Sequence, residues 1–148
     1  MKILVLNGPN MNMLGIRQPE IYGKTTYGDL VDIIQKKALE LGVDVSFRQS
    51  NHEGELVDII QECYFSGIDG IVFNPAAYTH TSIAIADALK AVNIPTVEVH
   101  ISDVSNREDY RRISYVRPCC IATVMGKGID GYCEALELLK DHIYENKN

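Results

Sequence analysis

The stretch KILVLNGPN, residues 2–10, decides the fold class of this chain of 148 residues. The apolar run from Ile3 to Leu6 is typical of a strand that is buried on both faces, as in a parallel sheet. The run stops at Asn-Gly-Pro-Asn, which favours a turn. A nucleotide-binding protein would carry a glycine-rich phosphate loop here, but neither GxGxxG nor GxxxxGK(S/T) is present. The sequence therefore predicts a buried strand followed by a loop that has a different task.

Strand-like and helix-like segments alternate along the rest of the chain. Further strands are predicted at VDVSFRQ (43–49), GIVFN (70–74), PTVEVH (95–100) and CCIATVMG (119–126). Helices are predicted at 27–42, 54–67, 81–93 and 131–145, with Thr25 or Thr26 as the first N-cap and Gly42 as its C-cap. This alternation predicts one domain over residues 1–148: an α/β, flavodoxin-like three-layer fold with about five parallel strands and helices on both faces.

Composition limits the classes of function. The net charge is −6 and the sequence pI is about 5.1, which argues against nonspecific binding to nucleic acid or membranes. The apolar runs are too short to span a bilayer, and the N-terminus does not resemble a signal peptide, so a cytoplasmic protein is expected. The cysteines form no CxxC pair, and we expect reduced thiols rather than a metal site; they are Cys63, Cys119, Cys120 and Cys133.

Polar residues follow the predicted strands, at the edge where ligands bind in such sheets. Each has a plain structural alternative: a turn for Asn10, a cap for Asn74, a backbone hydrogen bond for His80 and a solvated surface for the arginines. Together they predict a site at this edge. The candidates are Asn10, Asn74, His80, Glu98, His100, Ser102, Arg107, Arg111 and Arg112.

Glu98 and His100 are two residues apart in a predicted strand, so their side chains should point to the same face. A carboxylate beside an imidazole fixes its tautomer and favours its protonated form, as a general acid requires. A purely structural pair would have the same spacing, and both interpretations stay open at this point.

The loop over residues 8–24 is long for a compact domain, and loops of this length are often lids. Gly15 and Gly23 are candidate hinges. Arg17 and Tyr22 lie within the loop. An arginine about 4 Å from a phenol favours phenolate by roughly 4 kcal/mol at an effective dielectric near 20, before desolvation opposes it. The pair is therefore either a tyrosine base with its activating arginine, or an anchoring aromatic and a surface arginine.

These segments together resemble the type II 3-dehydroquinate dehydratases over nearly the whole chain. The matching motifs are LNGPNMNMLGIRQPEIYG, RQSNHEGELVD, NPAAYTHTS, IPTVEVHISD, REDYRRISY and GKGIDGY. The resemblance implies a flavodoxin-like enzyme that removes water from 3-dehydroquinate to give 3-dehydroshikimate, without a metal, cofactor or Schiff base.

The resemblance also implies a role for each matching residue. Tyr22 would abstract the C2 proton to give an enolate, and Arg17 would lower the pKa of that tyrosine. His100 would protonate the departing C1 hydroxyl, Glu98 would orient it, and Asn10 would help hold the enolate. The implied substrate-binding residues are Asn74, His80, Ile101, Ser102 and Arg111, the last of which holds the carboxylate.

The resemblance further implies a homo-oligomer, commonly a dodecamer of four trimers, in which Asp87 contacts substrate in a neighbouring subunit. The helix TSIAIADALKAV is apolar almost all the way round, which independently favours a subunit contact. Several positions depart from the family's usual motifs: Met11 and Met13 replace leucines, Ser105 and Ile113 replace histidines, and Ala86 replaces an arginine beside Asp87.

The same fold can carry other functions. A phosphate-receiver domain needs acidic residues where Asn7, Asn10 and Asn74 stand, and a flavin site needs a Ser/Thr-rich loop after the first strand. Lys127 could form a Schiff base in an amine-dependent dehydratase. A non-catalytic binding protein, or quinate breakdown by the same reaction in place of aromatic biosynthesis, are the remaining alternatives.

Overall fold

The protein folds around a five-stranded sheet in the computed structural model, which describes residues 1–16 and 19–147, with the backbone only for residues 21 and 22. The strand order is β2-β1-β3-β4-β5, and every neighbouring pair is parallel. The strands are β1 (Lys2–Asn7), β2 (Asp44–Gln49), β3 (Gly70–Asn74), β4 (Thr96–His100) and β5 (Ala122–Met125). The predicted flavodoxin-like α/β fold is confirmed.

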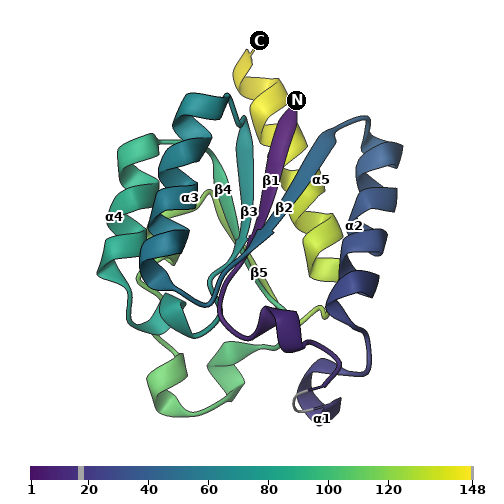
Figure 1. Cartoon of the computed structure of the whole chain (residues 1–148), viewed down its shortest axis with the longest axis vertical. Coiled ribbons are helices and arrows are strands. Elements are labelled where there is room, and N and C mark those ends of the chain that lie inside the picture. Colours follow the sequence, from purple (N-terminus) through teal and green to yellow (C-terminus); the bar gives the residue numbers. More distant parts are fainter. Residues whose placement is uncertain (17–18, 148) are drawn as a thin grey trace.

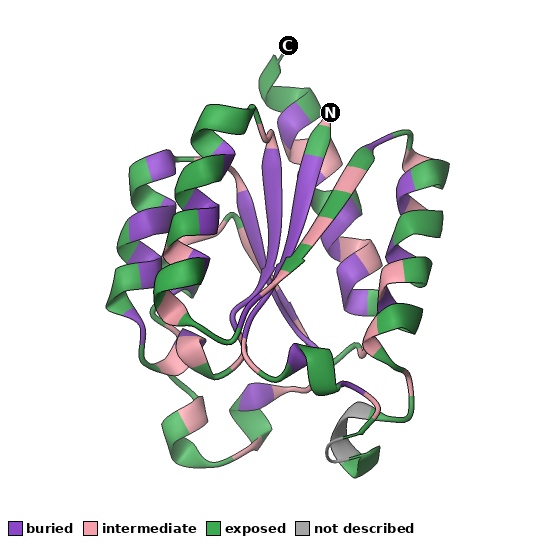
Figure 2. Cartoon of the chain, viewed as in Figure 1, coloured by how far each residue is buried: buried purple, intermediate pink, exposed green. Residues whose placement is uncertain are grey.

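Helices cover both faces of this sheet. Figure 1 shows α3 (Glu53–Ser66) and α4 (Ile83–Val92) on one side, and α2 (Tyr27–Leu41) and α5 (Asp130–Lys147) on the other. Each face has its own apolar core: Leu4 and Leu6 of β1 pack toward α3 and α4, whereas Ile3 and Val5 pack toward α2 and α5. Figure 2 shows the central strands almost entirely buried between the helical layers. Alternate residues of one strand thus supply both cores.

Short helical turns shape the loops. They are α1 (Pro19–Tyr22), η1 (Met11–Met13), η2 (Ala76–His80), η3 (Val104–Asn106), η4 (Asp109–Arg111) and η5 (Arg117–Cys119). The last of these corrects one boundary, because the predicted strand at 119–126 begins only at Ala122. Residues 117–119 instead form a turn containing Pro118, which cannot donate a backbone hydrogen bond to a sheet.

Local sequence sets the ends of α2. Thr26 is the N-cap: its Oγ1 accepts from the Asp29 amide at 3.1 Å, and the Asp29 carboxylate accepts from the Thr26 amide at 3.0 Å. This capping box decides between the two candidate threonines. Gly42 ends the helix in the left-handed conformation at φ 70, as expected of a C-cap glycine.

The carboxyl ends of the strands meet at one edge, where the loops gather at the bottom of Figure 1. The register sets Asn7 beside Asn74 and Phe73 beside Glu98, so polar residues distant in sequence lie side by side. Gly8, after β1, lies directly against the backbone of Pro75, after β3: a Cβ on Gly8 would lie 2.5 Å from the Pro75 carbonyl oxygen. Only glycine lets these two loops pack. Within the described part of the chain, no helix is long and apolar enough to cross a membrane.

Candidate active site

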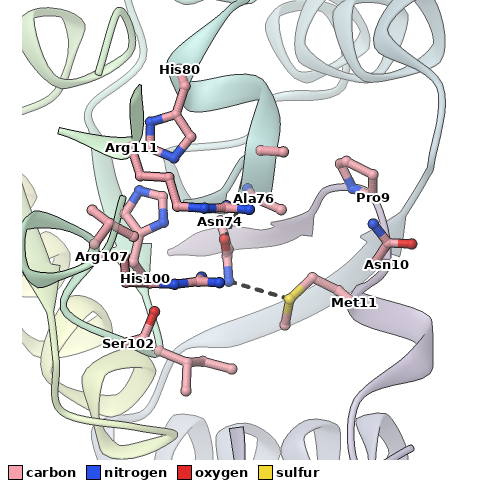
Figure 3. A pocket seen from close by; sticks show the side chains of 13 residues that line it. Pro9, Asn10, Met11, Asn74, Ala76, His80, His100, Ser102, Arg107 and Arg111 are labelled. Carbon is pink, nitrogen blue, oxygen red and sulfur yellow. Dashed lines mark hydrogen bonds between the residues drawn. The ribbon is translucent and has the colours of Figure 1, made fainter. Parts of the chain in front are cut away.

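A pocket opens at the carboxyl edge of the sheet, where sequence analysis placed the site. Its walls come from the loops after β1, β3 and β4. Figure 3 shows His80, His100 and Arg111 on one side of the pocket and Pro9 and Asn10 on the other. The predicted residues that line it are Asn10, Asn74, His80, His100, Ile101, Ser102, Arg107 and Arg111.

Glu98 and His100 meet directly, as their spacing in β4 predicted. The His100 Nε2 atom lies 2.6 Å from Glu98 Oε2, and the two side chains are 5% and 0% exposed. An ionised carboxylate only accepts, so Nε2 carries the hydrogen. Nδ1 is then the ring nitrogen available to a ligand in the pocket. The geometry suits an imidazolium that donates from Nδ1 while Glu98 balances its charge.

Three hydroxyl groups surround the Glu98 carboxylate. Thr79 and Ser114 hydrogen-bond to Oε2, the latter at 3.0 Å, and Thr123 approaches Oε1 at 3.5 Å. Burial by itself would raise the pKa of Glu98, but the hydrogen bonds and the charge of His100 together hold it below its ordinary value. Glu98 is therefore an ionised carboxylate in a buried position.

His80 combines both roles that its position allowed. Its Nδ1 lies 2.7 Å from the Ile113 carbonyl oxygen, so Nδ1 donates and Nε2 is left as an acceptor. Burial lowers the pKa of His80, which favours the neutral ring. Since His80 also lines the pocket, it can accept a hydrogen bond from a ligand hydroxyl group.

Asn74 is held by a buried hydrogen-bond relay. Its Nδ2 donates to the Tyr132 hydroxyl at 2.8 Å, and that hydroxyl donates to Asn7 Oδ1 at 2.6 Å. The Asn74 Oδ1 accepts from the Ala76 amide at 3.0 Å. Ala76 has φ 53, which is costly for a residue with a side chain and is seen often at functional sites. The amide of Asn74 is thus presented to the pocket in one orientation.

Asn10 is a turn residue and also lines the pocket. It has φ 71, and its backbone amide donates to Asn51 Oδ1 at 3.0 Å. Asparagine tolerates this left-handed conformation better than most residues. The turn interpretation and the site interpretation are therefore both satisfied by one residue.

The arginine segment, residues 107–112, contributes arginines both to the pocket and to the surface. Arg107 and Arg111 line the pocket, and Arg111 Nε lies 2.8 Å from Glu108 Oε2. This contact is an ion pair by distance, and the buried Nε makes no hydrogen bond among the described contacts. The guanidinium group at the pocket wall is suited to a carboxylate ligand. Arg112 instead pairs with Asp109 on the surface at 3.2 Å, as expected of a solvated arginine.

Other expected residues lie elsewhere. Asp87 is exposed on the outer face of α4, away from the described pocket walls. Lys127 pairs with Glu134 at 2.6 Å and is not among the described lining residues. Arg17 and the side chain of Tyr22 lie outside the described residues. Among the residues that the structure does describe, no His/Cys/Asp/Glu group is arranged to hold a metal ion.

Several residues that support the site were not predicted from the sequence, among them Thr79, Ser114 and Tyr132. The two hydroxyl residues adjoin His80 and Ile113 within motifs that were singled out, but serine and threonine are too common for position alone to identify them. Tyr132 lies in α5 far along the chain, and only the packing of that helix brings its hydroxyl to Asn74.

A parallel α/β sheet with a buried carboxylate–imidazole pair and paired arginines at its carboxyl edge defines a flavodoxin-like protein with an acid–base site for an anionic ligand. The family described as "Dehydroquinase class II" matches residues 1–140. The chain belongs to this family, which confirms the resemblance seen in the sequence.

Relatives with this activity in their names match nearly the whole chain. The 3-dehydroquinate dehydratase of Caldicellulosiruptor saccharolyticus is 55% identical over 140 residues, covering 95% of this chain and 97% of the relative. That of Clostridium perfringens strain 13 is 52% identical over 143 residues, covering 97% and 98%. The crystal structure of type II dehydroquinase from Butyrivibrio crossotus superposes with a TM-score of 0.93 at 51% identity, covering 95% and 97%.

Proposed function

We propose that the protein is a 3-dehydroquinate dehydratase, a hydro-lyase that converts 3-dehydroquinate reversibly to 3-dehydroshikimate and water. The observation that carries the proposal is the buried Glu98–His100 pair at the wall of a pocket that also presents two arginines. An acid for the leaving hydroxyl group and an arginine suited to a carboxylate are two of the groups that elimination of water from a hydroxy-carboxylate substrate would use, together with a base. Full-length similarity to enzymes named for this activity supports the same conclusion.

In the proposed reaction His100 is the general acid. Its imidazolium donates a proton from Nδ1 to the C1 hydroxyl group as the C1–O bond breaks, which releases water. The Glu98 carboxylate holds Nε2–H and stabilises the imidazolium before that transfer. The buried position of both groups makes this interaction stronger than it would be in water.

The proposed base is Tyr22, which takes the C2 proton and leaves an enolate. Arg17, five residues earlier in the same loop, lowers the pKa of the phenol. The loop over 8–24 acts as a lid on a single catalytic domain of residues 1–148. The described left-handed glycines Gly15, at φ 85, and Gly23, at φ 76, flank these two residues and support the lid proposal. Asn10 holds the enolate, through an ordered water as in the family.

Substrate binding is assigned to the remaining pocket residues. Arg111 binds the carboxylate through its guanidinium group, which lines the pocket. The neutral His80, with Nε2 as acceptor, is suited to a substrate hydroxyl group. Asn74, Ile101 and Ser102 complete the polar and apolar contacts. The reaction as proposed uses no cofactor.

Assembly is part of the proposal. The outer face of α4 exposes apolar residues, including Ile83, together with Asp87. In a homo-oligomer this face would be covered, and Asp87 would reach substrate in a neighbouring subunit. We propose a dodecamer of four trimers in the cytoplasm, with no nucleic-acid or membrane partner.

The metabolic role has two forms with the same chemistry. Aromatic amino-acid biosynthesis through the shikimate pathway is proposed, and quinate breakdown is the alternative. A Schiff-base route through Lys127 is disfavoured because its amine pairs with Glu134 away from the described pocket walls. Borohydride trapping with substrate tests it: covalent labelling of Lys127 would support the amine route.

Ultraviolet absorbance on mixing the protein with 3-dehydroquinate tests the function. The double bond of the product is conjugated with its carboxylate and absorbs where the substrate does not. We expect a rising signal that survives exhaustive treatment with a chelator. A flat signal from folded, oligomeric protein would contradict the proposal and favour a binding protein.

A further inference from the structure

We infer that Thr79 and Ser114 are positioning residues that act through Glu98 on His100. The inference rests on the proposed function, in which His100 is the acid. Neither hydroxyl belongs to the described pocket wall, so neither is assigned a contact with substrate. Their role is to fix the orientation and ionisation of the carboxylate, and to join the arginine segment to it.

The contacts converge on one carboxylate. Thr79 Oγ1 donates to Glu98 Oε2, and Ser114 Oγ lies 3.0 Å from Oε2 and 3.1 Å from Oε1. The two hydroxyl oxygens are themselves 2.8 Å apart. Thr79 and Glu98 are both fully buried. The two hydroxyls and the His100 ring therefore occupy most of the accepting positions of Glu98.

Backbone contacts decide which way the Ser114 hydroxyl points. The Arg117 amide donates to Ser114 Oγ at 3.0 Å, which uses one of its lone pairs. A serine hydroxyl has a single hydrogen, and an adjacent buried carboxylate is the strongest acceptor for it. The hydrogen of Ser114 is thus directed at Glu98.

Backbone contacts on either side of Ser114 hold the arginine segment in place. The Ile113 carbonyl accepts from His80 Nδ1 at 2.7 Å, and the Tyr115 amide donates to the Thr79 carbonyl at 2.8 Å. Ser114 lies between these two contacts. Arg111 lies three residues earlier. The group proposed to bind the substrate carboxylate and the proposed acid therefore share one anchor, at Ser114.

The surroundings of Glu98 contain few other charges in the part of the chain that is described. His100 lies on the same strand, and His80 approaches from η2 with Arg111 near it. Cys120 is beside Glu98, and burial raises the pKa of its thiol, so it stays neutral. With no second cation hydrogen-bonded to Glu98 among the described contacts, the hydroxyl groups are the main neutral support of its charge.

Two substitutions test the inference: Ser114→Ala and Thr79→Val, each of which removes one hydroxyl. We expect kcat to fall about ten-fold in each, because a hydrogen bond to a charged group contributes about that factor or more. KM for 3-dehydroquinate should change less. The pH at which kcat declines on the acid side of its pH profile, its acid limb, should rise by about one unit, because loss of a donor makes Glu98 easier to protonate.

Controls separate positioning from general damage. Thr79→Ser keeps the hydroxyl and should restore the acid limb of the unmodified protein. Thr81→Val makes the same exchange at an exposed position two residues away and should leave the profile unchanged. If Thr79→Val fails to fold, Ser114→Ala decides alone, because Ser114 is only half-buried and leaves little cavity.

A measurement without turnover keeps the inference separate from the proposed function. The side-chain carboxyl carbon of Glu98 can be followed by NMR against pH in each variant, and Glu98 should protonate at higher pH without Ser114 Oγ. A protein inactive on 3-dehydroquinate that still shows this shift would overturn the function alone. Folded Ser114→Ala and Thr79→Val proteins with unchanged titration and unchanged kcat would overturn the inference.

Discussion

Glu98→Gln isolates the charge of the buried pair from its shape. Glutamine has nearly the same volume, and its remaining oxygen can still accept from His100 Nε2, which lies 2.6 Å from Oε2 in the parent. What disappears is the negative charge. Opposite charges about 4 Å apart at an effective dielectric near 20 attract by about 4 kcal/mol. Since about 1.4 kcal/mol is a factor of ten, losing this attraction removes up to about 10³-fold of the stabilisation that the pair gives to a positive charge on the His100 ring.

We therefore expect kcat to fall by about 10²- to 10³-fold, while substrate affinity measured by calorimetry changes little. The ultraviolet assay gives kcat directly. Glu62→Gln is the matched control, because Glu62 pairs with Arg48 at 3.3 Å on the surface, where such pairs contribute little. A Glu98→Gln enzyme within about three-fold of the parent kcat would refute the electrostatic reasoning.

A double substitution sharpens the test. If Glu98 acts only through the imidazole, Glu98→Gln should add almost nothing to the loss already caused by His100→Ala. Independent, additive losses would mean that Glu98 has a second role at the site. The three kcat values are measured in one buffer with folded fraction checked by circular dichroism.

Three further outcomes are expected. Tyr22→Phe should abolish turnover but leave substrate affinity largely intact, and a fully active variant in the ultraviolet assay would remove Tyr22 as the base. Tyr132→Phe should lower the unfolding free energy by about 1–3 kcal/mol, because it removes the donor to the buried Asn7 Oδ1; a denaturant titration measures this loss, and an unchanged midpoint contradicts it. The pKa of Glu98 is lowered in the folded state, so its stabilising contribution is complete above the ordinary glutamate value and is lost as pH falls through the folded value. Thermal melts in acid should show this loss in the parent and less of it in Glu98→Gln; equal acid dependence of the two would argue against it.

Short-range patterns in the sequence were enough to predict the fold. Apolar runs such as Ile3 to Leu6 identified the strands, and alternation with helices predicted the parallel sheet. Gly42 and the threonine pair before α2 located its ends to within a residue. These features depend on neighbours within one turn or one strand, so the sequence displays them directly. The start of the last strand was misplaced because the amides of Cys119 and Cys120 donate back to the Val116 and Arg117 carbonyls of a turn, which an apolar run does not reveal.

The same local logic found part of the site. The spacing of Glu98 and His100 predicted that they share a face. Because ligands bind at the carboxyl ends of parallel strands, the sequence also predicted that Asn10, Asn74 and His80 lie together at that edge. The assignment of Tyr22 and Arg17 depends on resemblance to the family and on the loop that carries them.

Tertiary structure alone decided which groups support these residues. Thr79, Glu98 and Ser114 come from η2, β4 and a loop, and Tyr132 reaches Asn74 from the last helix. Their hydroxyl groups are ordinary in sequence and become significant only where sheet register and helix packing bring them within hydrogen-bond distance. The sequence by itself determined the strands, the caps and the pairing of Glu98 with His100. The partners that hold that carboxylate ionised follow from contacts between distant segments, because hydrogen bonds depend on distance in space and not on spacing along the chain.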